Sequence, residues 1–437
     1  VRPGEAPLVR APLPFLGHAL AVGRDLRALL RDCQRVHGDV FTLLVAGQRM
    51  TFVLDPFSYP HVLKAQDDLS FHELAEQFGR RAFGYLPFER SGLDRETFDS
   101  FYGRFLKGTA LTPLTDRASE RMRVALAREA DTRWRELGLF DLVSRCVFMA
   151  GFEAMFGDGA ADGDVAAEFR RFDRWFPLLI AGAPIRLLPG AGAGFARILD
   201  AVDTLRADAS EFIRVREALL VGGTTRDNRN RLQAGIVWAA ATNTIPPAFW
   251  SLAYLLRDPT ARTEINAELS AHGTDDLKRL PKLQSAVHEA LRLSSGSLTI
   301  REARRDCELT LESGRTISLH AGDQVALSPF AVHYDPDIFP DPDTYRFDRF
   351  LADGGPKQFF KRGKRVPIPL MPYGGGVSMC PGRFLANNEV MQFVALALTE
   401  LDLELDSPAL PPFDNSRAGL GVLPPRGDVR CRLRRRA

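Results

Sequence analysis

The chain has 437 residues, of which 45% are hydrophobic and 26% charged, and its formal net charge is +2. This composition is that of an ordinary globular protein and excludes disordered, collagen-like and coiled-coil classes. With 57 basic against 55 acidic residues, the chain has no excess charge that would attract nucleic acid. The five cysteines include no Cys-x-x-Cys pair, so we expect neither a zinc ribbon nor a disulfide framework, and a reducing compartment is indicated.

In chain order, residues 1–14 have the pattern of neither a signal peptide nor a membrane-spanning segment. Apolar alternation at 41–45 and 50–54 predicts a β-hairpin. Long amphipathic stretches from about 95 to 290 indicate helices. Strand patterns return at 298–301, 308–311 and 316–319, and a last helix is expected after Gly382. Because no repeat or linker interrupts the chain, we expect one mixed domain.

Residues 234–256 are uncharged and long enough to span a bilayer. Pro246 and Pro247 near the centre would break the helical hydrogen bonding, and the polar residues 242–244 would be costly in lipid. We therefore expect a helix buried inside a large soluble domain, with a polar, kinked middle that serves a purpose.

The sharpest local feature is at residues 371–386, where three consecutive glycines precede Cys380 and Gly382 follows it. Glycines allow a tight backbone course, which suits a loop that lies against a large planar ligand. Cys380 stands just before a helical pattern, whose first-turn N–H groups favour a thiolate. A structural cysteine beside a glycine turn is the alternative interpretation.

These residues resemble the haem-ligand loop of cytochromes P450. Three further motifs precede the loop in the order that the family has: residues 240–244 on a central helix, the pair Glu289-x-x-Arg292, and the segment 345–350 with Arg349. A Glu-x-x-Arg pattern alone is weak, because helix salt bridges are common. All four motifs in register make the resemblance specific.

The resemblance implies the cytochrome P450 fold: mainly α with small β-sheets, a single domain over 1–437. The β-rich parts are expected at about 38–65, 296–330 and 410–437, and the helical body at about 66–295 and 383–400. It also implies haem b (iron protoporphyrin IX) with Cys380 as the iron ligand, whose thiolate favours O–O cleavage. Glu289, Arg292 and Arg349 are then a structural cluster that positions the cysteine loop.

Segments 176–185, 241–251, 291–301 and 414–424 resemble the cholesterol and oxysterol 7α-hydroxylase family, with sterol 12α-hydroxylase and prostacyclin synthase as neighbouring branches. The likeness implies 7α-hydroxylation of cholesterol or an oxysterol, with O2 and electrons from NADPH through NADPH-cytochrome P450 reductase. It further implies a monomer at the cytosolic face of the endoplasmic reticulum membrane, with peripheral membrane contact and an anchor that is not present in this chain.

The chain departs from the family pattern in the haem loop. Tyr373 replaces the usual Phe or Trp, and Ser378 replaces a basic residue, so that one partner of a haem propionate is missing. Arg301 is the expected replacement, and Arg104 and Lys107 are weaker alternatives. The expected cofactor-binding residues are Cys380, Arg301, Ser378, Tyr373, Gly374, Gly382, Arg104 and Lys107.

Asn243 stands where most monooxygenases carry an acid before the distal threonine, here Thr244. Asn cannot carry a proton at neutral pH, so it either orders a water or bonds a sterol hydroxyl directly. These two residues are the catalytic candidates. The candidates for an apolar sterol pocket are Trp238, Ala241, Asn243, Ser295, Leu298, Leu420 and Val422.

Two stretches bear on partners. The basic run 357–365 is either a solvated loop or a docking surface for an acidic reductase. The apolar residues 175–185 and 187–189 belong either to the core or to a patch that dips into a membrane.

Two other functions stay open. A redox-neutral isomerase of lipid endoperoxides, like prostacyclin synthase, needs no proton relay and is compatible with Asn243. A haem sensor or electron carrier would not need a large lipid pocket. Thr244 and the basic run favour the hydroxylase.

Overall fold

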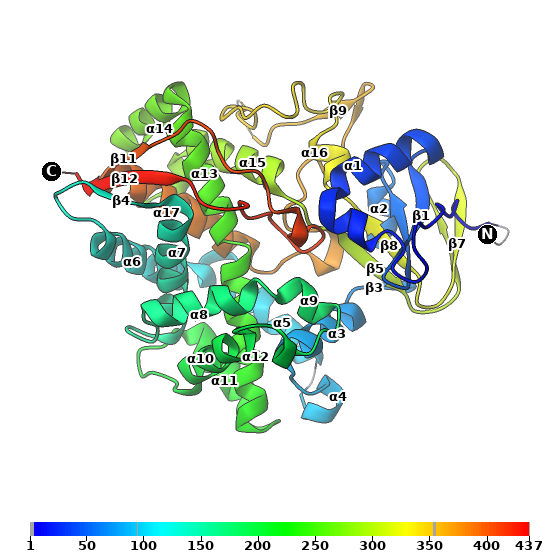
Figure 1. Cartoon of the computed structure of the whole chain (residues 1–437), viewed down its shortest axis with the longest axis horizontal. Helices are drawn as coiled ribbons and strands as arrows, with labels where there is room; N and C mark the ends of the chain where they lie inside the picture. Colours follow the sequence, from blue (N-terminus) through cyan, green and yellow to red (C-terminus); the bar gives the residue numbers. More distant parts are fainter. Residues whose placement is uncertain (1–3, 94, 353–354, 437) are drawn as a thin grey trace. The chain divides into compact units, whose positions relative to one another are not determined.

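The computed structural model describes residues 4–93, 95–352 and 355–436. The chain forms two compact units (Figure 1). The β-rich unit consists of Val1–Ala75, His288–Cys380 and Phe413–Pro424, and the helical unit of Glu76–Val287, Pro381–Pro412 and Pro425–Ala437. The expectation of a single domain over 1–437 stays a prediction.

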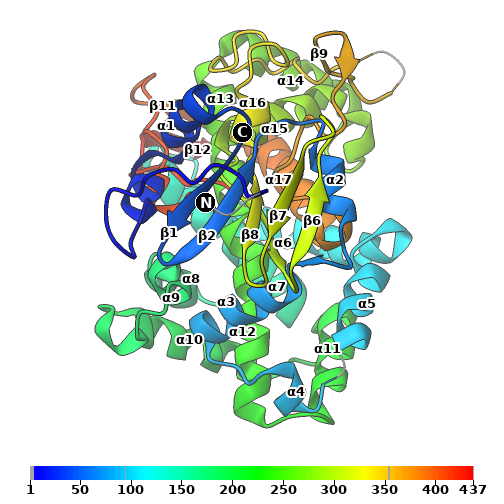
Figure 2. The same ribbon diagram turned by 90° about the vertical axis from the view of Figure 1, so that its right-hand side faces the viewer.

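The main sheet of the β-rich unit has five strands in the order β1-β2-β8-β5-β3, in which β2 and β8 pair in parallel and the other pairs are antiparallel. Figure 2 shows β1, β2 and β8 side by side. The hairpin expected near residues 41–54 is β1–β2, and Ala46 and Gly47 turn it with positive φ angles of 49° and 82°. The strands are β1 (Val40–Val45), β2 (Gln48–Val53), β3 (Leu69–Ser70), β5 (Thr299–Ala303), β8 (Gln324–Leu327), with the separate hairpins β6 (Cys307–Thr310)–β7 (Thr316–Leu319) and β9 (Phe360–Lys361)–β10 (Lys364–Arg365).

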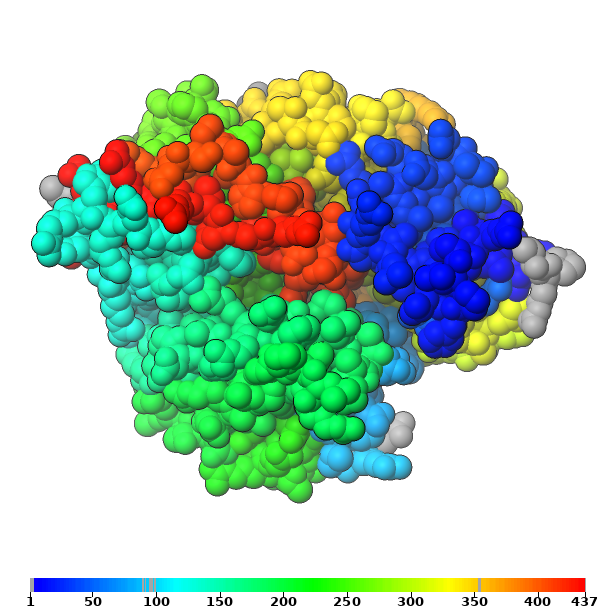
Figure 3. Space-filling view, viewed as in Figure 1, coloured from blue at the N-terminus to red at the C-terminus, as the bar shows by residue number. Residues whose placement is uncertain are grey.

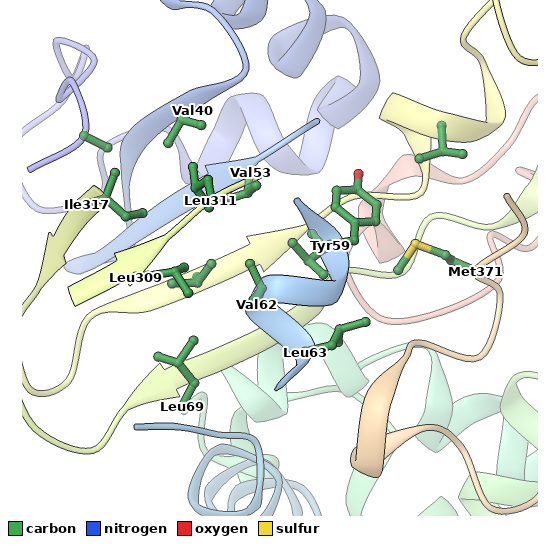
Figure 4. Packing of buried hydrophobic residues seen from close by; sticks show 14 of the residues in the cluster. Val40, Val53, Tyr59, Val62, Leu63, Leu69, Leu309, Leu311, Ile317 and Met371 are labelled. Atoms are coloured by element: carbon green, nitrogen blue, oxygen red, sulfur yellow. The ribbon is translucent and has the colours of Figure 1, made fainter. Parts of the chain in front are cut away.

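Short helices cover this sheet. The apolar side of α2 (Tyr59–Lys64) enters a buried cluster in which Tyr59, Val62 and Leu63 join residues of the strands and Met371 (Figure 4). The cluster reaches from the sheet to the segment before Cys380, so the start of the cysteine loop is part of the core. The other helical elements of the unit are α1 (Ala19–His37), α16 (Phe330–His333), η4 (Gly376–Ser378) and η5 (Asn415–Arg417).

The helical unit packs its helices with one small sheet, β11 (Leu401–Leu405)–β12 (Arg430–Arg435)–β4 (Arg135–Gly138). Its helices are α4 (Phe88–Ser91), α5 (Arg95–Phe105), η1 (Gly108–Leu111), α6 (Thr112–Glu129), α7 (Leu139–Phe156), α8 (Gly163–Asp173), α9 (Phe176–Ile180), η2 (Ile185–Leu187), α10 (Ala191–Asp203), α11 (Glu211–Val221), α12 (Arg226–Thr242), α13 (Ile245–Arg257), α14 (Pro259–His272), η3 (Leu277–Arg279) and α17 (Arg383–Glu400). The remaining helices, α3 (His72–Phe83) and α15 (Pro281–Ser294), contribute residues to both units. The chain is thus mainly α with small sheets, as the sequence predicts.

The uncharged stretch 234–256 is divided between α12 and α13, which meet at Asn243 and Thr244. The break occurs because Pro246 and Pro247 have no N–H to donate to the carbonyls four residues earlier. Most of α13 is buried, which explains its apolar composition. In the described part of the chain, no helix has both the length and the apolarity that crossing a bilayer requires.

Candidate functional site

A buried ion cluster lies at the end of α15. The carboxylate of Glu289 accepts from Arg292 Nε and Nη2 at 2.7 and 2.9 Å and from Arg349 Nε at 2.8 Å. Glu289 and Arg292 are fully buried. Arg292 also donates to the carbonyl of His333, and Arg349 to carbonyls within residues 340–344. The structure thus brings together the three charged residues that the sequence grouped, and their hydrogen bonds fix the segment after α16.

His333 connects this cluster to the cysteine loop, and sequence reasoning missed it. Its Nδ1–H donates to the Arg292 carbonyl at 3.0 Å, and its Nε2 accepts from the Met371 N–H at 3.0 Å. Burial, together with the nearby Arg292, lowers the pKa of His333 to about 3. The ring is therefore neutral, with one donor and one acceptor nitrogen, and both nitrogens are used. The only signal in the sequence is a histidine between the mainly apolar residues 325–332 and the Pro- and Asp-rich residues 334–343.

The glycine loop takes its course because three successive residues lack a side chain. Gly374 and Gly376 have φ angles of 71° and 69°, in the left-handed region that favours glycine. A Cβ on Gly375 would lie 2.8 Å from Leu63 Cδ1 of α2. The Cys380 N–H closes the loop by donating to the Tyr373 carbonyl at 3.0 Å. In the structure, the glycine loop thus comes close to α2.

Cys380 is the only one of the five cysteines whose side chain is exposed, and none of them forms a disulfide. Burial raises the pKa of the thiols of Cys33, Cys146, Cys307 and Cys431, to about 12 for Cys431. A buried thiol of raised pKa is a poor source of the thiolate that binds iron. The surroundings therefore select Cys380 among the five.

Arg301 on β5 is buried, with 5% of its surface exposed. Its Nη1 donates to the Ile300 carbonyl and its Nη2 to the Gly375 carbonyl, each at 2.8 Å. Across the described residues no carboxylate forms an ion pair with it, and burial lowers its pKa. A buried guanidinium without a counter-charge is costly. This site therefore suits an anionic group supplied by a ligand.

The other predicted cofactor residues have different surroundings. Ser378 ends η4 and is half-buried, and Gly382 is the N-cap of α17. Burial, and next the nearby Cys380, raises the pKa of the Tyr373 hydroxyl. Arg104 and Lys107 are exposed side chains of the helical unit. The haem roles of all five stay predictions.

The end of α12 has an altered hydrogen-bond pattern. Thr244 is buried, and its Oγ1 donates to the Ala240 carbonyl at 2.6 Å, while its N–H donates to Ala241 at 3.1 Å. Asn243, the C-cap, is half-buried, and its N–H also donates to Ala241. The Thr244 hydroxyl proton is therefore held on a backbone carbonyl, and the oxygen keeps lone pairs for accepting.

The predicted pocket residues come from both units. Trp238 and Ala241 lie with Asn243 on the last turns of α12. In the β-rich unit, residues 294–298 run beside 419–423, where Ser295 bridges to Val422. Ser295 is fully buried and its hydroxyl donates to Leu291, which leaves it poorly placed to bind a substrate. Leu298 and Leu420 are half-buried, and Val422 is buried.

Glu389 of α17 is a second residue that the motifs did not indicate. Its carboxyl group borders a cavity of about 10 Å³, roughly the space of one water, lined by residues of α7 and by Val237, Ala240 and Ala241 of α12. Desolvation raises its pKa to about 8, so it is mostly protonated at neutral pH. The signal in the sequence is one acid at the head of residues 390–398, which are apolar except for Gln392.

Comparison with known proteins identifies the family. Residues 219–431 match the family model described as Cytochrome P450. Cholesterol 7-alpha-monooxygenase from Cricetulus griseus is 33% identical over 470 residues, which cover 98% of this chain and 92% of the relative. The chain is a cytochrome P450. It is 32% identical over 477 residues to the human 7-alpha-hydroxycholest-4-en-3-one 12-alpha-hydroxylase, covering 99% of this P450 and 93% of the relative.

As a member of this family, the P450 is a haem-thiolate monooxygenase, and the residues present fit the haem. The exposed cysteine offers one sulfur ligand, and the buried Arg301 without a carboxylate partner offers a place for an anionic haem substituent. No cluster of three or more His, Cys, Asp or Glu side chains that would hold another metal occurs among the described residues.

The buried cluster predicts a large difference between two glutamates. Replacing Glu289 by Ala leaves two arginines buried without their carboxylate, and we expect a loss of about 3–5 kcal/mol in the free energy of unfolding and poor haem retention. The control is Glu264→Ala, which breaks the half-exposed surface pair with Lys282 and should lower the free energy of unfolding far less than Glu289→Ala does. Thermal denaturation and haem-to-protein ratios check this, and normal haem loading in Glu289→Ala would contradict it.

A second prediction concerns the iron ligand. In Cys380→Ser, we expect the reduced carbon monoxide complex to lose the Soret band of thiolate ligation, because no other exposed thiol is described. Cys307→Ser, a partly buried thiol, should keep that band. A thiolate-type band that survives in Cys380→Ser would show that another residue binds iron.

The raised pKa of Glu389 predicts a pH-dependent stability. The folded state keeps the Glu389 proton up to a pKa of about 8, whereas the unfolded chain, in which the pKa is 4.5, releases it at lower pH. The contribution of this protonated carboxyl group to the stability of the fold is therefore fully present below about pH 4.5 and is lost as the pH rises through about 8. Glu389→Gln, which has no such proton to lose, should raise the melting temperature at pH 8.5 but not at pH 4.5.

The control for that measurement is Glu136→Gln, at an exposed position on β4, which should change neither melting temperature. Equal effects of Glu389→Gln at both pH values would mean that the Glu389 carboxyl is not protonated in the folded state.

Proposed function

We propose that this P450 hydroxylates a sterol at the 7α position, with cholesterol or an oxysterol as substrate. The observation that carries the proposal is the 33% identity to a cholesterol 7-alpha-monooxygenase across 98% of the chain. Hydroxylation at the 12α position is the second candidate, because the 12α-hydroxylase from Sus scrofa is also 33% identical, over the whole chain.

In this proposal Cys380 is the only protein ligand of haem b, and Arg301 pairs with a haem propionate. The haem, bound through a thiolate, supplies the cleavage of dioxygen and the oxidising power. The carbonyl of Gly375 orients the Arg301 guanidinium from the same loop that carries the cysteine. One side chain thus connects the position of the propionate to that of the ligand loop.

The proton for oxygen activation passes through the Thr244 Oγ1 in this proposal. That hydroxyl donates to Ala240 in the structure, so to relay a proton it must turn its O–H from the Ala240 carbonyl towards the oxygen being reduced, while its oxygen takes a replacement proton from a water. Asn243, with both a donor and an acceptor on its side chain, orders that water. Trp238 and Ala241, on the same helix, form an apolar wall against the sterol.

Electrons come from NADPH through NADPH-cytochrome P450 reductase, and the basic run supplies the docking surface. Lys361 pairs with Asp335 at 2.6 Å and Lys364 pairs with Glu312. Lys357, Arg362 and Arg365 are exposed and, among the described residues, form no ion pair, and Phe360 beside them is also exposed. Complementary charge on an acidic partner speeds the encounter.

Contact with the endoplasmic reticulum membrane, at its cytosolic face, is proposed for the apolar segment after α8, which forms part of the surface of the helical unit (Figure 3, green). Phe176, Leu179 and Ile180 are buried, whereas Leu178 and Leu187 are 46% and 68% exposed. The segment is thus half core and half apolar surface, and the exposed leucines are the contact points.

The test is substrate binding followed by product analysis. Cholesterol, 27-carbon oxysterols and an endoperoxide analogue are added separately to the haem-loaded enzyme. We expect a sterol to change the haem spectrum and, with reductase and NADPH, to give a 7α-hydroxylated product by mass spectrometry. A 12α product would favour the second candidate, and rearrangement of the endoperoxide without NADPH consumption would contradict the hydroxylase.

Asn243→Leu separates its two possible roles in the same assay. If Asn243 orders water, sterol binding persists while NADPH is consumed without product, and Thr244→Ala behaves alike. If Asn243 bonds the sterol hydroxyl, Asn243→Leu weakens binding and leaves the coupling of the bound fraction normal.

A further inference from the structure

The C-terminal residue of α8, Asp173, reaches α12 through two hydrogen bonds. Its Oδ1 accepts from Trp238 Nε1 at 2.8 Å and from Thr242 Oγ1 at 3.0 Å. The two donors are four residues apart, so they lie on the same face of α12, one turn apart. One carboxylate oxygen therefore holds both of the last turns of that helix.

The indole of Trp238 is held by a second contact from the same region. Phe176 of α9, three residues after Asp173, stacks on it with ring centroids 3.8 Å apart and planes inclined by 16°. Phe83 meets it edge-on at 6.1 Å. The hydrogen bond at Nε1 fixes the rotation of the indole in its plane, which stacking alone leaves open.

The place of these contacts gives them a consequence for the substrate. Thr242 directly precedes Asn243 and Thr244, at the point where α12 ends. The segment that begins with Phe176 continues to the exposed Leu178 and Leu187. Asp173 therefore joins the end of α12 to the segment that carries the exposed leucines.

We propose that Asp173 is a positioning residue for sterol binding: it orients Trp238 and the last turn of α12, and it couples that helix to the segment 175–189. The inference rests on the proposed function, in which Trp238 lines the sterol pocket. Asp173 touches neither the substrate nor the haem in this account and acts through Trp238 and Thr242.

The first experiment measures sterol affinity by the spectral shift of the haem-loaded enzyme, with imidazole binding as the measure of an intact haem site. Asp173→Ala should weaken sterol binding about tenfold, as expected for two hydrogen bonds to a charged acceptor, and leave imidazole binding within about twofold. Asp173→Asn keeps an acceptor oxygen and should restore most of the affinity. Asp164→Ala, an exposed acid on α8, is the matched control.

A variant that lacks both hydrogen-bond donors tests whether Asp173 acts through Trp238 and Thr242. In Trp238→Phe/Thr242→Val, which removes both donors and keeps a ring against Phe176, the further change Asp173→Ala should alter sterol affinity by less than about twofold. A tenfold additional loss there would overturn the proposed route. Unchanged affinity in Asp173→Ala, where Trp238→Ala weakens binding, would overturn the inference and leave the proposed function standing.

A measurement without sterol keeps the two claims separate. Ultraviolet resonance Raman spectra report hydrogen bonding at indole nitrogens, and Trp238→Phe assigns the signal of this residue. Asp173→Ala should shift that signal and Asp164→Ala should not. If no sterol binds the wild type, the proposed function fails and the role of Asp173 in sterol binding fails with it. The Raman result then decides whether Asp173 holds Trp238, and no shift would overturn the positioning as well.

Discussion

The carboxylate of Glu289 is the interaction on which the cysteine loop depends. It is fully buried and binds two guanidinium groups, one from its own helix and one from residue 349. Buried charges are costly unless they are paired, so this cluster has one low-energy arrangement. Hydrogen bonds connect the cluster to the loop, because the Arg292 carbonyl accepts from His333, whose other ring nitrogen accepts from the Met371 N–H. Met371 begins the segment that ends at Cys380.

In contrast to this polar network, the two consecutive helices α12 and α13 are mainly apolar around the break between them. Yet two prolines and Thr244 remove ordinary helical hydrogen bonds at one place. Because the prolines have no N–H to donate, backbone carbonyls at the break can accept hydrogen bonds from other groups. The buried acid Glu389 borders a cavity with residues 237, 240 and 241 of α12, and Asp173 accepts from Trp238 and Thr242 on an adjacent face of the same helix. Polar groups are thus concentrated at the break.

Sequence reasoning found the features that depend on neighbours in the chain. Glu289 and Arg292 are three residues apart, the β1–β2 turn needs a two-residue loop, and the Cys380 loop is one continuous motif. The mixed, mainly helical fold also followed from local periodicity and the resemblance.

The residues that were missed depend on partners distant in the sequence. His333 connects Arg292 to Met371 only because both residues meet its ring, and Asp173 matters only because two side chains of α12 donate to its carboxylate. The glycine loop predicts a planar ligand, which stays a prediction, but it gives no sign of Leu63, which lies beside Gly375. Such long-range contacts leave no periodic trace in one sequence.

Hydrogen exchange of the haem-loaded enzyme tests most directly whether the buried cluster holds the cysteine loop. The amides of Met371 and Cys380 donate to His333 and Tyr373, so they should be protected about as well as strands β2 and β8. In His333→Phe, residues 371–380 should lose that protection while the sheet keeps it. Unchanged protection of the loop in that variant would contradict the account, because the loop would then be held by something other than the cluster.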